Sequence, residues 1–108
     1  SDNKVGYYGK RHTFDVLTVA DDATVTLSSG GAGAALLIVY EHASGENALY
    51  YVGYGVTPVL MQNNGSTWAS ADTDGNYCVI TSGHTTTFKN RIGSSKTFSI
   101  TLFSAGLS

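Results

Sequence analysis

The chain has 108 residues, a formal net charge of -2, 42% hydrophobic residues and 13% charged residues. This length accommodates one hydrophobic core and therefore one domain. The slightly negative charge offers no basic surface to attract phosphates, so we expect neither nucleic acid nor an anionic membrane as a partner. One cysteine allows neither an intramolecular disulfide nor a zinc site built from cysteines, and no cofactor is expected.

The first part of the chain alternates apolar and polar residues as β-strands do, and no helical period is present. Residues 13–19 and 23–27 read as half-buried strands, and Asp21-Asp22 predicts a hairpin turn between them. After a glycine-rich connection at residues 30–33, residues 35–40 form an uninterrupted apolar run. Such a run predicts a central strand that is covered on both faces. No apolar run is long enough to span a bilayer, so membrane insertion is not expected.

The second part continues with short strands and strong turn signals. Pro58 predicts an edge strand or bulge, while Asn63-Asn64-Gly65 and Asp74-Gly75 predict hairpin turns. The strands are expected at residues 47–52, 56–62, 76–82, 85–89 and 97–103. About eight short strands with glycine-rich turns predict an all-β fold, an antiparallel, jelly-roll-like β-sandwich.

Residue patterns that would support metal binding or catalysis are weak. His12, His42 and His84 do not have metal-ligand spacing, and no Gly-x-Ser-x-Gly motif is present. Residues 72–76 resemble the start of a calcium loop, but Gly83 stands where that loop needs a bidentate Glu. Cys78 lies in a strand-like run and is expected to be a small buried residue. We therefore expect no metal site and no enzymatic activity.

Aromatic residues are the more informative candidates for binding. Adjacent residues of a strand point to opposite faces, so at most one of Tyr50 and Tyr51 faces the core, and the other is available for a subunit interface or a ligand. Trp68, between two predicted turns, is either a ligand contact on a loop or a cap on the end of the sandwich. The candidate ligand-binding residues are Trp68, Tyr54, Tyr51, His42, Glu46 and His84.

The Gly, Ser, Thr and Asn-rich strands and the segment Lys89-Asn90-Arg91-Ile92-Gly93-Ser94-Ser95-Lys96 before the last strand resemble the C-terminal head domains of bacteriophage tail fibres and related virion appendages. The resemblance implies a homotrimeric β-sandwich on the virion that contacts a polysaccharide or protein of the host surface. Residues 1–12 are then expected to be an N-terminal segment at the junction with a fibre shaft, and residues 13–108 the head domain. The resemblance assigns no ligand residue.

These observations favour a non-enzymatic attachment module that binds through loops near residues 41–46, 63–74 and 82–86, since binding residues usually lie on the loops of a rigid scaffold. Three alternatives remain. A capsid-decoration or fibre-assembly domain is expected to have an extensive apolar interface and no exposed aromatic cleft. A secreted carbohydrate-binding module is expected to act as a monomer, and a small hydrolase needs two acidic side chains facing each other in a groove.

Overall fold

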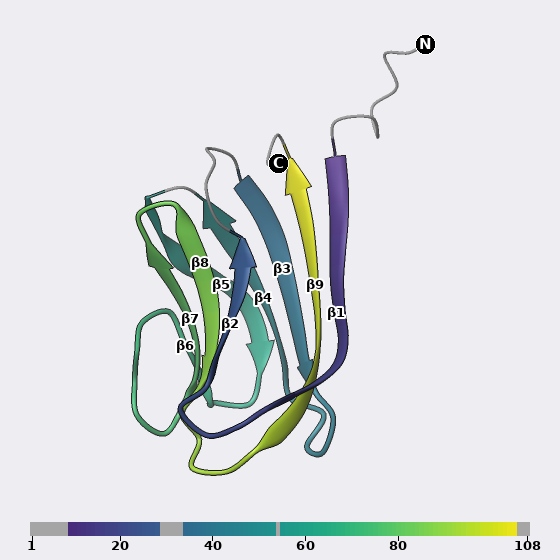
Figure 1. Cartoon of the computed structure of the whole chain (residues 1–108), viewed down its shortest axis with the longest axis vertical. Helices are drawn as coiled ribbons and strands as arrows, with labels where there is room; N and C mark the ends of the chain where they lie inside the picture. Colours follow the sequence, from purple (N-terminus) through teal and green to yellow (C-terminus); the bar gives the residue numbers. More distant parts are fainter. Residues whose placement is uncertain (1–8, 29–33, 54, 106–108) are drawn as a thin grey trace.

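The computed structural model describes residues 9–28, 34–53 and 55–105, which form nine β-strands in two packed sheets (Figure 1). The five-stranded sheet has the order β1 (Gly9–Val19), β9 (Lys96–Ala105), β3 (Ala34–Glu41), β4 (Asn47–Gly53) and β5 (Val56–Asn64). The four-stranded sheet has the order β2 (Thr24–Ser28), β8 (Thr85–Asn90), β7 (Tyr77–Ser82) and β6 (Trp68–Ala69). The predicted all-β sandwich is confirmed. No helix in the described part of the chain is long and apolar enough to cross a membrane.

The first and last strands are neighbours, and so are the second strand and the last but one. β1 pairs with β9 in the five-stranded sheet, and β2 pairs with β8 in the four-stranded sheet. This wrapping is like that of a jelly roll. The chain departs from that plan at β3, β4 and β5, which follow one another as an antiparallel meander in one sheet. Because β1 begins at Gly9, the first strand includes part of the segment 1–12.

The predicted hairpin turns are turns, but they do not make hairpins. Asp22 and Gly65 have positive φ values of 64° and 85°. The chain nevertheless passes from one sheet to the other at both places, and Asp74-Gly75 leads into a strand that runs parallel to β6. Turn residues fix the local backbone direction, whereas burial of the apolar faces decides which strands pair. The hairpins are β3–β4, β4–β5 and β7–β8.

Strand β3 is central in its sheet, between β9 and β4, as predicted. The expectation that both of its faces are covered is wrong for the isolated chain. Its residues alternate between buried and exposed, with Leu37 and Val39 at 0% exposure and Leu36 and Ile38 at 41% and 42%. The four-stranded sheet covers the inner face, and no described residue covers the outer one.

Four aromatic rings form a chain through the core between the two sheets. Trp68 and Tyr77 have ring centroids 5.1 Å apart, Tyr77 and Phe98 5.0 Å, and Phe98 and Phe88 4.7 Å. The last two pairs meet edge to face, a favourable arrangement for aromatic quadrupoles. Because Phe98 belongs to the five-stranded sheet and the other three to the four-stranded sheet, these rings join the two layers.

Two smaller expectations are also confirmed. β5 is an edge strand and contains Pro58, which has no N–H to donate to a neighbouring strand. Cys78 is fully buried, its thiol donates a hydrogen bond to the carbonyl of Thr73, and burial raises its pKa. The thiol is therefore a packed structural group rather than a nucleophile.

Candidate functional site

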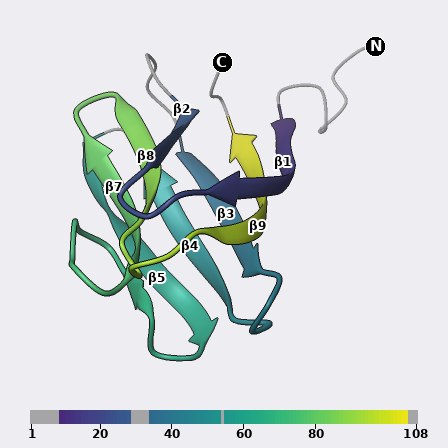
Figure 2. The same cartoon turned by 60° about the horizontal axis from the view of Figure 1, so that its bottom comes forward.

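The loops at one end of the sandwich make the best candidate site. Gly9 at the start of β1 is paired with Ala105 at the end of β9, so both described ends of the chain lie at one end of the sandwich. Val19 and Lys96, at the other ends of the same two strands, are paired at the opposite end of the sandwich. That opposite end, called the loop end here, carries residues 20–23, 42–46, 65–67, 70–76 and 91–95. Figure 2 turns the loop end toward the viewer. It therefore points away from both described ends of the chain.

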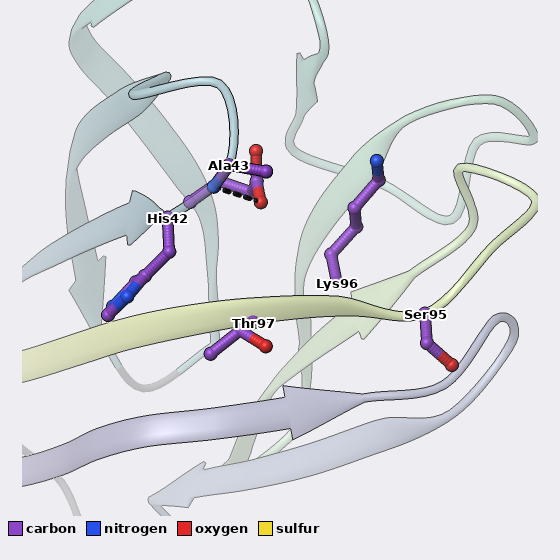
Figure 3. A pocket seen from close by; sticks show the side chains of 6 residues that line it. His42, Ala43, Ser95, Lys96 and Thr97 are labelled. Atoms are coloured by element: carbon purple, nitrogen blue, oxygen red, sulfur yellow. Dashed lines mark hydrogen bonds between the residues drawn. The ribbon is translucent and has the colours of Figure 1, made fainter.

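An open pocket of about 330 Å³ lies at the loop end. It is lined by the β3–β4 turn on one side and by the start of β9 on the other (Figure 3). The lining residues are Glu41, His42, Ala43, Ser95, Lys96 and Thr97. An imidazole, an ammonium group and two hydroxyls thus border one depression, and these groups suit a ligand rich in hydroxyl or acidic oxygens.

Glu41 holds the β3–β4 turn in shape. Its side chain is 1% exposed, and its carboxylate accepts hydrogen bonds from the amides of Ala43 and Ser44 at 2.9 and 2.8 Å and from the Ser44 hydroxyl. Burial raises the pKa of Glu41, but these hydrogen bonds and nearby Lys96 outweigh burial, so the pKa lies below its ordinary value. The carboxylate is consequently an anion that organises the turn and is poorly suited to give up a proton.

His42 lies on the surface next to the pocket. Its Nε2 and the hydroxyl of Ser99 are 2.8 Å apart, and its ring centroid is 5.4 Å from that of Tyr40. The Tyr40 side chain is 43% exposed on the outer face of the five-stranded sheet. His42 therefore connects the pocket with that face.

Arg91 ties three loops of the loop end together. Its guanidinium lies 3.2 Å from Asp22, 2.8 Å from Asp72 and 3.6 Å from Asp74, and Asp72 is also 3.1 Å from Lys89. Side-chain hydrogen bonds from Arg91 and Lys89 lower the pKa of Asp72 below its ordinary value of 3.8. Asp72 thus has two protein cations as partners in the segment that resembled a calcium loop. No group of three or more His, Cys, Asp or Glu residues in the described part of the chain could hold a metal.

Acid should weaken this ion-pair network in a predictable direction. Because the pKa of Asp72 is lower in the folded chain, its contribution to stability is present above pH 3.8 and is lost as the pH falls through the lowered value. We expect Arg91→Ala to lower the urea midpoint at neutral pH and to have a smaller effect at a pH below the folded pKa of Asp72. An equal effect at both pH values would contradict this role, and Thr26→Ala, at an exposed position of β2 outside the network, serves as the control.

Of the six predicted site residues, His42 and Glu46 lie at the loop end. The Glu46 carboxylate accepts a hydrogen bond from the Thr67 hydroxyl at 3.1 Å, and its side chain packs so closely on Gly65 that a Cβ there would overlap it. Glu46 therefore connects the β3–β4 turn with the loop before β6, a structural contact that leaves His42 as the more accessible of the two.

The other four predicted residues lie elsewhere. Trp68 is 7% exposed, and its indole N–H donates to the carbonyl of Asn64 at 3.2 Å. Of the two roles expected from the sequence, it therefore has that of a cap on the end of the sandwich. Tyr51 is 38% exposed on the outer sheet face, while Tyr50 is buried, as alternation requires. His84 is in the β7–β8 turn, at the end opposite the loop end. Tyr54 lies outside the described residues.

Sequence reasoning missed the start of β9 as part of the site. Ser95, Lys96 and Thr97 reach the pocket because β9 is inserted between β1 and β3, next to a turn more than fifty residues earlier in the chain. The sequence signal for this part of the site was the Lys96 cation between the hydroxyl residues Ser95 and Thr97. That signal does not place Lys96 at the pocket, because the strand order that brings it there cannot be read from the local pattern.

No protein-family model matches the chain, and no curated protein matches it. Among solved structures, the chain is similar to the Acinetobacter phage vB_ApiP_P1 tailspike protein, with a TM-score of 0.42 and 18% sequence identity. The match covers 99% of this chain and 23% of the tailspike chain, so this chain spans about a quarter of the length of that protein.

Proposed function

We propose that this chain is a non-enzymatic attachment module of a bacteriophage virion appendage, which binds a polysaccharide or protein of the host surface through the loop end. The observation that carries the proposal is the position and construction of that end. It lies opposite both described chain ends, and Glu41 and Arg91 hold its loops in place while His42 and Ser95 remain exposed. A preorganised loop end loses little conformational entropy when it binds.

The chemistry of the pocket favours a polysaccharide over an apolar ligand. His42 and the hydroxyls of Ser95 and Thr97 can exchange hydrogen bonds with sugar hydroxyls, and Lys96 can pair with acidic sugars. The one carboxylate lining the pocket, that of Glu41, is occupied by its own turn. This arrangement supports binding without hydrolysis, since glycoside hydrolysis normally uses two carboxyl groups.

Adsorption to bacterial cells and to their purified surface polysaccharides tests the proposal. We expect the double variant His42→Ala, Lys96→Ala to bind at least about tenfold more weakly than the unaltered chain, because polar contacts at a small site carry much of the affinity. Thr26→Ala, at an exposed position of β2 in the other sheet, is the matched control and should bind normally. Selective binding that the double variant retains in full would contradict the proposed site.

A second candidate is an assembly domain that binds other virion proteins and no host surface. Two observations favour it: Trp68 is buried rather than displayed in an aromatic cleft, and the outer face of the five-stranded sheet is apolar. The adsorption experiment separates the two functions, because an assembly domain adsorbs to no bacterial cell or polysaccharide. Release of sugar from the polysaccharide would instead indicate a hydrolase.

A further inference from the structure

The outer face of the five-stranded sheet carries large hydrophobic side chains that no described residue covers. They come from four neighbouring strands and are between 38% and 55% exposed. The residues are Leu36, Ile38 and Tyr40 of β3, Tyr51 of β4, Val56, Val59 and Met61 of β5, and Phe103 of β9. We call them the outer apolar face.

Strand register makes much of this face continuous. Leu36 is opposite Tyr51 on one side and Phe103 on the other, and Tyr51 is in turn opposite Val59. One row of the face thus crosses all four strands. Ile38, two residues along β3, extends the face next to Leu49. Scattered surface hydrophobics need no explanation, but a connected patch marks an interaction site.

The four strands that carry this face contain few charged residues, and Arg11 of the neighbouring strand β1, opposite Phe103, stands at its edge. β4 and β5 contain no charged residue, and the charged residues of β3 and β9 are Glu41 and Lys96, both at the loop end. The outer face of the four-stranded sheet is different. It carries Thr24 and Thr26 of β2 and Thr85, Thr87 and Lys89 of β8. A surface with charges only near its edge and at the loop end can meet a copy of itself without burying like charges at its centre.

The size of the face fits an interface between copies. Aromatic side chains bury roughly 150–250 Å² each, and these eight residues, five of them smaller, are on average a little under half exposed, which corresponds to roughly 600 Å² per copy. The largest apolar patch of a monomer is typically about 300–600 Å², and a stable interface buries about 800 Å² per partner, roughly 65% of it apolar in homo-oligomers. The outer apolar face therefore supplies about the apolar area that one copy contributes to a stable interface.

The edge of the sheet is less suited to assembly than its face. β5 is an edge strand, but it contains Pro58 and its pairing with β4 shifts register twice. Prolines and bulges obstruct the addition of another strand at an edge. A partner is therefore expected to pack on the face.

We propose that the outer apolar face is the surface through which copies of this chain associate, with their five-stranded sheets packed against one another. The uninterrupted apolar sequence of β3 is then explained, because the inner face packs in the core and the outer face packs against neighbouring copies. This assembly is argued from the structure of the chain and does not depend on the proposed function.

Light scattering during size-exclusion chromatography tests the assembly with the purified chain. We expect an oligomer at micromolar concentration, and at least a tenfold weaker association after Ile38→Lys, which places a charge in the middle of the face. The matched control is Thr26→Lys, which adds the same charge to an exposed strand position of the other sheet. Circular dichroism and urea unfolding establish that both variants are folded.

Each outcome decides one point. A wild-type chain that is monomeric at hundreds of micromolar overturns the proposal, as does an oligomer that Ile38→Lys leaves intact. An oligomer that is lost in Ile38→Lys but kept in Thr26→Lys supports the proposal. An assembled wild-type chain that adsorbs to no bacterial cell or polysaccharide overturns the proposed function and leaves the assembly intact, so the two failures can be told apart.

Discussion

Replacing Phe98 by alanine is expected to lower the free energy of unfolding by about 3–5 kcal/mol, which is most of the stability of a typical small domain. Phe98 is fully buried and contacts both Tyr77 and Phe88, so it joins the five-stranded sheet to the four-stranded sheet. Removing the ring leaves a cavity between the two layers, and the loss of edge-to-face contacts adds to the cost. Urea unfolding followed by tryptophan fluorescence measures the change, because Trp68 lies in the same chain of rings.

Phe103→Ala is the matched control for this prediction, since it removes the same ring from the same strand at a position that is 45% exposed. Both variants should be compared in the Ile38→Lys background, so that assembly does not contribute to the measured stability. There we expect Phe103→Ala to cost less than about 1 kcal/mol. Equal losses for the two variants would mean that the two faces of β9 do not differ in burial as described.

Asn90→Ala is expected to cost about 2–4 kcal/mol, because several buried polar groups lose their partners at once. Asn90 is fully buried, and its amide donates to the carbonyls of Val19 and Ser94 at 2.9 and 2.8 Å. Its side-chain oxygen accepts from the amide of Ile92 at 3.0 Å. One side chain therefore fixes the end of β1 and the loop between β8 and β9, which leads to the pocket.

The effect of Asn90→Ala should reach the pocket as well as the global stability. Hydrogen exchange of the amides at residues 92–97 should become faster in the variant, because local opening of that loop becomes less costly. Asn63→Ala, at an exposed position with one hydrogen bond to the nearby Gly65 carbonyl, is the control and should have a small effect. Unchanged exchange in the Asn90 variant would contradict its role in holding the loop.

The sequence was sufficient to predict the fold class, the edge position of β5, the burial of Cys78 and the opposite orientations of Tyr50 and Tyr51. Each of these depends on a local property, such as alternation of apolar residues or the missing N–H of Pro58. Strand partners were not predictable in the same way. Asp21-Asp22 and Asn63-Asn64-Gly65 direct the backbone into a turn, but the packing of the two sheets decides where the next strand goes.

The candidate site was predictable in part for the same reason. His42 was found because a turn after a strong strand is exposed, but Lys96 reaches the same pocket through the insertion of β9 between β1 and β3. Trp68 lies in the core because the two-residue strand β6 packs it against Tyr77. The predicted loops do not form one surface either, since residues 82–86 lie at the end opposite the loop end.

The apolar run of β3 is the most instructive difference between sequence and structure. Its pattern predicts burial on both faces, and the described residues of the chain cover only one of them. Tertiary structure alone therefore leaves Leu36 and Ile38 unexplained, whereas association of copies explains both. The central claim about this protein is that the outer apolar face is covered by other copies of the same chain.

Oxidation of Met61 by hydrogen peroxide, followed by mass spectrometry at several protein concentrations, tests this claim most directly. Met61 is the sole methionine of the chain, and it is 55% exposed on the outer apolar face. We expect its oxidation to slow several-fold as the concentration rises and copies associate, and to be fast at every concentration in Ile38→Lys. A wild-type rate that is independent of concentration and equal to that of Ile38→Lys would contradict the claim.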